Sequence, residues 1–446
     1  PFVELERGAT YVLEAALPPG AGSGGVARGV ASDGALAAEL ATLEGLGSAV
    51  TERRPARRRP REELEPRPHH VYAFEDRRVP DKLVVRSGFG PSDLHAVFNL
   101  VRAQGHGEEE LGALVSFVEG GALLLQNGPY PYWEHALARE DESRPMVRRH
   151  AGGAFARDRV DLEVTHFRDA RDAVVARLSW VEPGGYGATV DRHVLVAKRE
   201  PRFVLVRDCF AAPRAMQASV GSVWHATDVE PRHGAHWYDV FVRSPLANTF
   251  RLRNRPRRLW LGFVERPGVR VEGFLEESYL PTAPRCSEFS DADWVPAECR
   301  GGPPFVLAQR FVGALGPGPG VCADNLLVPH DVDVGGDAVA QRVSALHVGR
   351  RSVALELRLA GEDGARWLVV ADPDGEGIAT PGLAAKAAYA VARSGGGEAP
   401  YVFAADARRI AWRDLDLAWE DPVSIERGGR LVGRARADAA GPANAR

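Results

Sequence analysis

One segment, Gly105–Trp133 (GHGEEELGALVSFVEGGALLLQNGPYPYW), holds side chains that could transfer a proton, hold a cation or stack on a ring. His106 lies between two glycines, and a histidine titrates near neutral pH, as a group that exchanges protons must. Tyr130, Tyr132 and Trp133 end the segment, and they could form a stacking platform or cap the end of a strand. A lone histidine in a loop is more often an ordinary surface residue than a catalyst, so both interpretations stand.

Two later motifs offer second-rank candidates for the same chemistry. Tyr186 lies in GGYGATVDR, where the glycines would let another molecule approach closely, and Arg192 follows on the same strand pattern. An equally good interpretation makes Tyr186 the aromatic cover of a sheet edge. His225 follows Trp224, and this pair is typical of a core tryptophan with a surface neighbour.

Composition excludes several classes of protein. A net charge of -4 argues against a general nucleic-acid binder. No apolar run approaches the length needed to span a membrane. The chain begins at Pro1 without a signal-peptide pattern, so we expect it to be processed or to be a piece of a longer protein.

The four cysteines are too few for a disulfide scaffold, and none of them lies in a CxxC motif. Cys286 and Cys299 bracket a polar loop that one bridge could close in an exported protein. The alternative is that all four cysteines are reduced thiols.

The elements that must position these residues fall into three regions. Residues 1–50 contain a strand-like start (ATYVLEAALP) and one expected helix at Ala35–Gly47, ALAAELATLEGLG. Residues 51–70 are rich in arginine and proline, which predicts a linker without packed elements. From residue 71 to 446 short apolar segments alternate with turns, and only Gly382–Ser394 (GLAAKAAYAVARS) resembles a helix.

Many of these segments alternate apolar and polar residues with a period of two, which buries one face of an antiparallel sheet. So many strands in series predict a mostly β fold, with large antiparallel sheets packed as a sandwich. The segment after His106 predicts a strand, a turn at Glu119–Gly121 and a second strand. This hairpin would place Glu108 opposite Gln126 and Asn127.

Several motifs, taken in order, resemble the heparinase II/III-like polysaccharide lyases. The motifs are RSGFGPSD (Arg86–Asp93), GHGEEE (Gly105–Glu110), GGALLLQNG (Gly120–Gly128) and His150 in VRRHAGG. The resemblance implies a supersandwich-like β domain that follows a helical toroid. Residues 1–50 are too short for a toroid, so this segment would be its remnant.

The resemblance also implies site roles. His106 takes the place of the family's catalytic histidine, whereas the places of its zinc ligands hold Glu108, Gln126 and His150. An uncharged glutamine is a poor zinc ligand, so we expect no bound metal.

The implied activity is β-elimination on an acidic polysaccharide by a periplasmic or secreted protein. His106, Tyr186 and His225 are then the catalytic candidates. Tyr130, Tyr132, Trp133 and Arg192 are the candidates for substrate binding. The alternative is a non-catalytic carbohydrate-binding or interaction domain of the same fold. A sugar isomerase is a third and more distant alternative.

Overall fold

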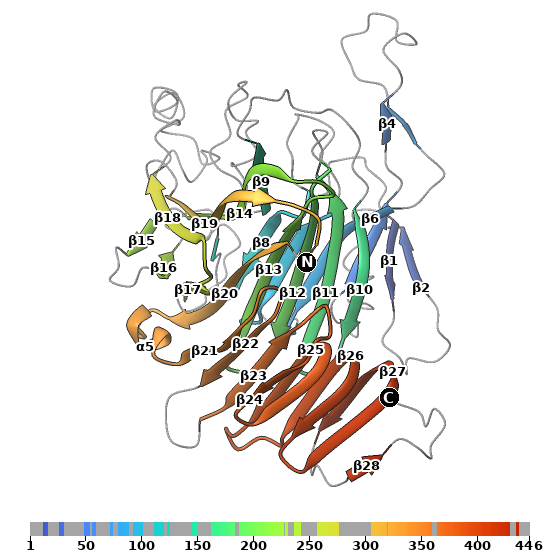
Figure 1. Ribbon diagram of the computed structural model, residues 1–446, viewed down its shortest axis with the longest axis vertical. Coiled ribbons are helices and arrows are strands. Elements are labelled where there is room, and N and C mark those ends of the chain that lie inside the picture. The colour runs from blue at the N-terminus through green and yellow to red at the C-terminus, as the bar shows by residue number, and fades with distance from the viewer. Residues whose placement is uncertain are drawn as a thin grey trace, which may run out of the picture.

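The computed structural model consists almost entirely of strands, as Figure 1 shows. Among the described residues the only α-helix is α5, Gly336–Ala340, and no helix there is long and apolar enough to cross a membrane. The structure describes residues 12–16, 26–30, 49–53, 56–58, 72–74, 79–88, 92–100, 111–119, 123–124, 145–149, 162–182, 187–226, 228–230, 236–241, 257–275, 305–318, 320–358, 364–428 and 434–436.

An eight-stranded antiparallel sheet, the central sheet, forms the middle layer (Figure 1). Its strands, in spatial order, are β10 (Glu163–Asp169), β11 (Ala173–Val181), β12 (Thr189–Ala197), β13 (Phe203–Ala211), β20 (Val321–Asp331), β17 (Arg257–Phe263), β16 (Trp237–Phe241) and β15 (Asp228–Glu230).

Two four-stranded sheets cover one face of the central sheet. The β6 sheet has the order β3 (Ala49–Arg53), β6 (Val79–Arg86), β7 (His95–Asn99) and β8 (Leu114–Val118). The β14 sheet has the order β18 (Val269–Leu275), β19 (Phe305–Leu315), β14 (Met216–Ala226) and β9 (Pro145–Arg149). One apolar core joins them to the central sheet.

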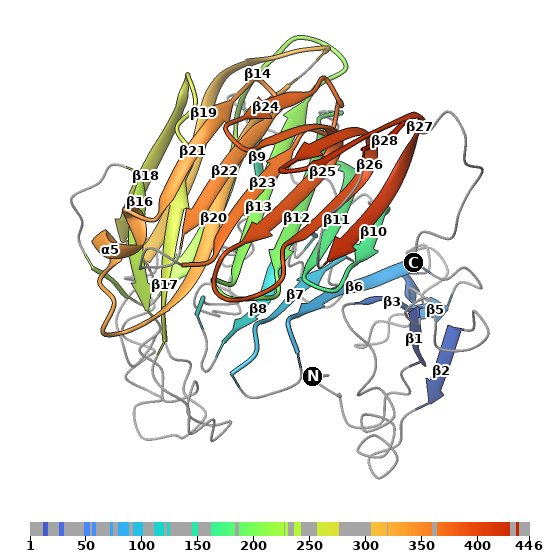
Figure 2. The same ribbon diagram turned by 90° about the horizontal axis from the view of Figure 1, so that it is seen from below.

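The other face is covered by a second eight-stranded sheet, the C-terminal sheet, drawn in orange and red in Figure 2. Its strands are β21 (Val343–Val348), β22 (Val353–Arg358), β23 (Arg366–Ala371), β25 (Leu383–Ser394), β26 (Tyr401–Trp412), β27 (Leu415–Gly428) and β28 (Arg434–Arg436), with β24 (Ile378–Thr380) paired to β25. Only β27 and β28 pair in parallel among the described strands. Two small hairpins lie outside these layers, β1 (Val12–Ala16) with β2 (Val26–Val30) and β4 (Ala56–Arg58) with β5 (Tyr72–Phe74).

Alternation along single strands explains why the central sheet is a middle layer. In β11, Val174 and Ala176 face the core shared with the β6 and β14 sheets, whereas Ala173 and Val175 face the core shared with the C-terminal sheet. Such a strand is apolar on both faces because both faces exclude water. The predicted fold class, a mostly β sandwich of large antiparallel sheets, is confirmed.

The helix predicted at Gly382–Ser394 is wrong, since β25 occupies Leu383–Ser394. Alanine favours helices, but it also fits a strand that packs on both faces. In β25, Tyr389 and Val391 face the central sheet while Ala390 and Ala392 face the opposite side. Pairing with β23 and β26 therefore overrides the local propensity.

The expected linker is also corrected in part. β3 includes residues 51–53 and pairs with β6, and β4 lies wholly within residues 51–70. Charged residues do not exclude an edge strand, because alternate side chains can remain in water. The expected helix at Ala35–Gly47 lies outside the described residues.

The hairpin expected after His106 is described only in part. β8 pairs with β7, and Leu123 and Leu124, which are both buried, lie in no strand. The amide of Leu123 donates to the carbonyl of Phe117 at 2.9 Å, which agrees with the expected turn. Gln126 and Asn127 lie outside the described residues, so the second strand stays a prediction.

A disulfide joins Cys209 of β13 to Cys322 of β20, which lie directly opposite each other in the register. The alternative of four reduced thiols is therefore wrong. Cys286 and Cys299, which the sequence analysis offered as one possible bridge, both lie outside the described residues.

Candidate functional site

Most residues predicted for the site lie outside the described residues, so their roles stay predictions. These are His106, Tyr186, Tyr130, Tyr132, Trp133, Glu108, Gln126 and His150. What the structure does describe is Arg192, His225 and parts of the sequence motifs around them.

The first motif, Arg86–Asp93, lies between β6 and β7, and its two ends are hydrogen-bonded. The amide of Ser87 donates to the carbonyl of Leu94 at 2.9 Å, and the amide of Leu94 donates back to Ser87 Oγ at 2.9 Å. A Cβ on Gly88 would lie 2.3 Å from Asp93 Oδ2, so only glycine lets the Asp93 carboxylate approach this closely. The motif thus fixes Asp93 at one end of the β6 sheet.

Glu119 follows β8 and is almost fully buried, with an exposed fraction of 1%. Its Oε1 accepts a hydrogen bond from Arg202 Nη1 at 2.8 Å and lies 3.4 Å from Arg257 Nη2. Arg202, in the turn between β12 and β13, also lies 3.5 Å from Asp93 Oδ1. Asp93, Glu119, Arg202 and Arg257 are called the Glu119 cluster below. In it, Arg202 connects Asp93 of the first motif to Glu119, which lies just before the motif Gly120–Gly128.

Burial raises the pKa of Glu119 to about 7, although Arg257 and Arg202 pull it down. Glu200 adds a smaller upward effect. The other oxygen, Oε2, is buried and has no hydrogen-bond partner among the described residues. A carboxyl group of this kind can hold or release a proton near neutral pH, which is the property that general acid–base chemistry needs.

We expect the Glu119 carboxyl to titrate near pH 7 in a ¹³C NMR titration. Because the folded pKa lies above the unfolded value, the stability that Glu119 contributes is fully present below about pH 4.5 and is lost as pH rises through 7. Glu119→Gln should therefore flatten the dependence of the unfolding free energy on pH between about 4.5 and 7, the interval between the unfolded and the folded pKa of Glu119. A Glu119 titration near pH 4 would contradict this assignment.

Arg192 points into the core, with no exposed surface. Its Nε and Nη2 donate to the two carboxylate oxygens of Asp208 at 2.7 and 2.8 Å, and its Nη1 donates to the carbonyl of Gly112 at 2.5 Å. The guanidinium lies over the rings of Phe98 and Trp224. A side chain without accessible surface contacts no substrate, so the predicted substrate-binding role is replaced by a structural one: Arg192 ties the β6 sheet to the central sheet.

Further polar side chains extend this buried pair across the core. Ser222 Oγ donates to Asp208 Oδ2 at 2.6 Å, and Asn325 Nδ2 donates to Ser222 Oγ at 2.8 Å. The indole of Trp224 donates to Asn325 Oδ1 at 3.1 Å. Sequence reasoning missed this network, although a signal existed: Asp208, Ser222 and Asn325 are polar residues within strands that carry mostly apolar side chains.

His225 also has no exposed surface, and burial lowers its pKa to about 3. The imidazole is therefore neutral at physiological pH and is separated from solvent. Its predicted catalytic role does not fit this position. The sequence suggested a surface neighbour of Trp224, but in a strand covered on both faces both neighbours are buried.

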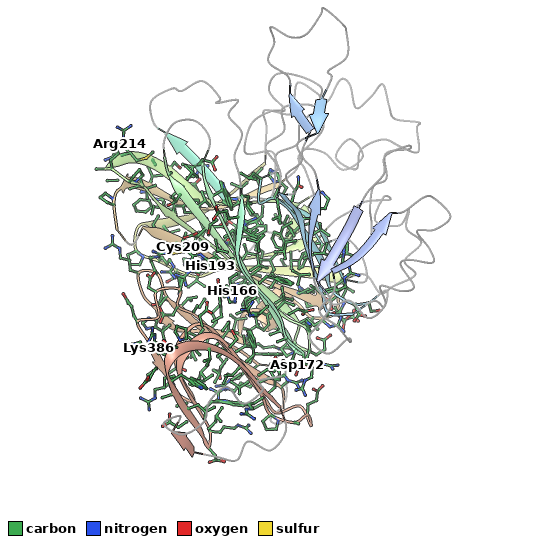
Figure 3. All side chains as sticks on the ribbon, turned by 90° about the vertical axis from the view of Figure 1, so that its right-hand side faces the viewer. His166, Asp172, His193, Cys209, Arg214 and Lys386 are labelled. Atoms are coloured by element: carbon green, nitrogen blue, oxygen red, sulfur yellow. A yellow bond between two sulfur atoms is a disulfide. The ribbon has the colours of Figure 1, made fainter. Side chains whose placement is uncertain are left out.

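A second cluster that the sequence analysis missed lies between the central and C-terminal sheets, near the two histidines labelled in Figure 3. His193 Nδ1 lies 2.5 Å from the Tyr389 hydroxyl, and the ring of His166 lies 5.5 Å from the Tyr389 ring. Burial lowers the pKa of His193 and raises that of Tyr389, so both stay neutral. His166 Nδ1 lies 3.3 Å from Asp406, which is half exposed. This cluster joins two layers, and its most exposed member is Asp406.

Among the described residues, no group of three or more His, Cys, Asp or Glu side chains could hold a metal ion. The three positions at which the resemblance would place zinc ligands lie elsewhere in the chain. Of these, the neutral amide of Gln126 does not fit zinc.

No family model matches the chain, and no curated protein matches it in sequence. Three solved structures share parts of its fold. Heparan sulfate lyase HepC from Pedobacter heparinus is 11% identical over 65% of this chain and 41% of its own, with a TM-score of 0.44. A Paenibacillus xanthan lyase is 9% identical over 73% and 31%, with a TM-score of 0.37. YeaD from Salmonella typhimurium, assigned as a mutarotase, is 11% identical over 62% and 97%, with a TM-score of 0.32.

This chain spans about two fifths of the length of HepC. At these identities and TM-scores, neither a family nor an activity follows from the likeness. The functional argument therefore depends on the residues of the chain itself.

Proposed function

We propose that this chain is the β domain of a polysaccharide lyase that cleaves a uronic-acid-containing polysaccharide by β-elimination. The observation that carries the proposal is the ordered set of motifs at Arg86–Asp93, Gly105–Glu110 and Gly120–Gly128. Asp93 of the first motif and Glu119, which precedes the third, are bridged by Arg202. This bridge brings the first motif close to the residue that precedes the third, which supports a shared site.

In the proposed reaction a base removes the proton on C5 of the uronate. The C5–H electron pair forms the C4–C5 double bond, the C4–O bond breaks, and the departing oxygen takes up a proton. His106 is the proposed proton-transfer group, and an arginine or amide facing the uronate carboxylate would stabilise the charge that develops there. No step depends on a metal.

The Cys209–Cys322 disulfide supports the proposal that the protein is exported, because structural disulfides persist mainly in oxidising compartments. The proposed setting is periplasmic or extracellular, where an acidic polysaccharide is accessible. A helical toroid domain, encoded with this chain or supplied separately, would complete the catalytic cleft.

We expect His106→Ala, made in the protein expressed from its complete reading frame, to lower turnover about a hundred- to ten-thousand-fold, the usual contribution of a general acid–base group. Activity is followed through the ultraviolet absorbance of the new double bond, which is conjugated to the carboxylate. His69→Ala is the control, because His69 matches no motif and should leave turnover nearly unchanged. Wild-type turnover in His106→Ala would refute the role of His106.

The alternative function is a non-catalytic carbohydrate-binding domain, and Gln126 favours it because the glutamine breaks the ligand set that the resemblance implies. Retained binding of an acidic polysaccharide, with no elimination by the complete protein on any uronate polymer, would establish this alternative.

A further inference from the structure

A cavity of about 130 Å³ lies where the central sheet, α5 and the C-terminal sheet meet. Its lining comes from the ends of β17 and β20, from the segment that contains α5, and from β21 and β22. Figure 1 shows α5 beside this edge of the two sheets. Since a cavity needs roughly 10–15 Å³ of this volume to hold one water, the space admits a group about the size of one sugar ring.

One part of the lining is apolar. Val328, Val339 and Leu357 line the cavity and are 6%, 3% and 2% exposed, so their side chains are held by the surrounding core. A wall of this kind suits the flat C–H face of a ring and offers nothing to a small inorganic ion.

The charged part of the lining carries three arginines, Arg257, Arg342 and Arg358, against two acids, Glu200 and Asp331. Positive charge is therefore in excess. The guanidinium groups lie beside an apolar wall, where water competes less with an anionic ligand for their hydrogen bonds.

The three arginines differ in whether their side chains already pair with an acidic residue. Arg257 lies 3.2 Å from Asp331 and 3.4 Å from Glu119. Arg358 lies 2.7 Å from Glu356. For Arg342, only the backbone is bonded, through its amide to Val339 and its carbonyl to the amide of Arg358, and no side-chain acceptor is found within the part of the chain that the structure describes.

We propose that this pocket binds one uronate ring, whose carboxylate accepts hydrogen bonds from Arg342 while the ring packs on the valine and leucine wall. The planar guanidinium matches a carboxylate in two parallel hydrogen bonds. The inference deepens the proposed function, on which its choice of a uronate rests, by adding a subsite that holds substrate without taking part in bond cleavage.

The test is isothermal titration calorimetry of glucuronate into the full chain. A ligand of this size with one charged anchor is expected to bind with a Kd on the order of 1 mM. Arg342→Ala should raise the Kd at least about tenfold, because the variant loses the charge-assisted hydrogen bonds between the guanidinium and the uronate carboxylate. This variant should fold normally, because the Arg342 side chain bonds to no other described residue, and circular dichroism verifies the fold.

Three controls test the assignment of the pocket. Arg214→Ala removes an exposed arginine from the turn between β13 and β14 (Figure 3) and should leave the Kd unchanged. Glucose, which lacks the carboxylate, should not bind. Inorganic sulfate should bind more weakly than glucuronate, and equal binding of the two would overturn the assignment of a ring site.

Glucuronate binding that is absent, or that survives unchanged in Arg342→Ala, would overturn the inference. Calorimetry and the elimination assay together distinguish a failure of the proposed subsite from a failure of the proposed lyase function. Glucuronate binding without elimination by the complete protein contradicts only the lyase proposal, whereas elimination without binding at this pocket contradicts only the subsite.

Discussion

Asp208→Ala is expected to lower the free energy of unfolding by about 3–5 kcal/mol, the range observed when one partner of a buried ion pair is removed. Arg192 has no exposed surface and would keep its charge without the carboxylate that now accepts two of its hydrogen bonds. Ser222 would lose its acceptor at the same time. Chemical denaturation in guanidinium chloride measures the change.

Asp416→Ala is the matched control for this change. Asp416 also pairs with an arginine, Arg409, at 3.3 Å, but the two side chains are 50% and 58% exposed. Such surface pairs contribute about 0–1 kcal/mol. A loss below about 1 kcal/mol in Asp208→Ala, similar to the control, would show that Arg192 is not held as described.

Removing the Cys209–Cys322 disulfide is expected to cost about 2–5 kcal/mol, toward the upper end because the bridge closes a loop of 113 residues in the unfolded chain. The double variant Cys209→Ala/Cys322→Ala should therefore unfold at a lower guanidinium chloride concentration than the oxidised protein. Both sulfurs are buried and lie 3.3 Å from the Arg207 guanidinium.

Mass mapping of a non-reduced digest tests the pairing itself. A peptide that links Cys209 to Cys322 is expected, and its mass should split on reduction. Two separate unlinked peptides from freshly prepared protein would contradict the disulfide.

The strands could be predicted from the sequence because period two is a local property, visible at Leu415–Trp419 of β27 without knowledge of its partners. Gly382–Ser394 shows the limit of this method. Its alanines favour a helix locally. The segment forms a strand because it pairs with β23 and β26 and is packed on both faces. The domain boundaries at residues 50 and 70 stay predictions.

The site was less accessible to sequence reasoning. Sequence position shows that Arg192 lies on a strand, but it does not show that both faces of that strand are covered. The same holds for His225. The Glu119 cluster joins residues as far apart as Asp93 and Arg257, and charge alone does not indicate which arginine meets which acid.

The central claim is that the protein breaks a uronate polymer by elimination. Mass spectrometry of the products, after incubation of the complete protein with glycosaminoglycan and alginate polymers, tests this most directly. Elimination adds no water, so the account predicts fragments with one unsaturated uronate end, each lighter by one water than the hydrolysis product, together with rising ultraviolet absorbance. Fragments that carry the added water and show no absorbance, or polymers that stay intact on every substrate, would contradict it.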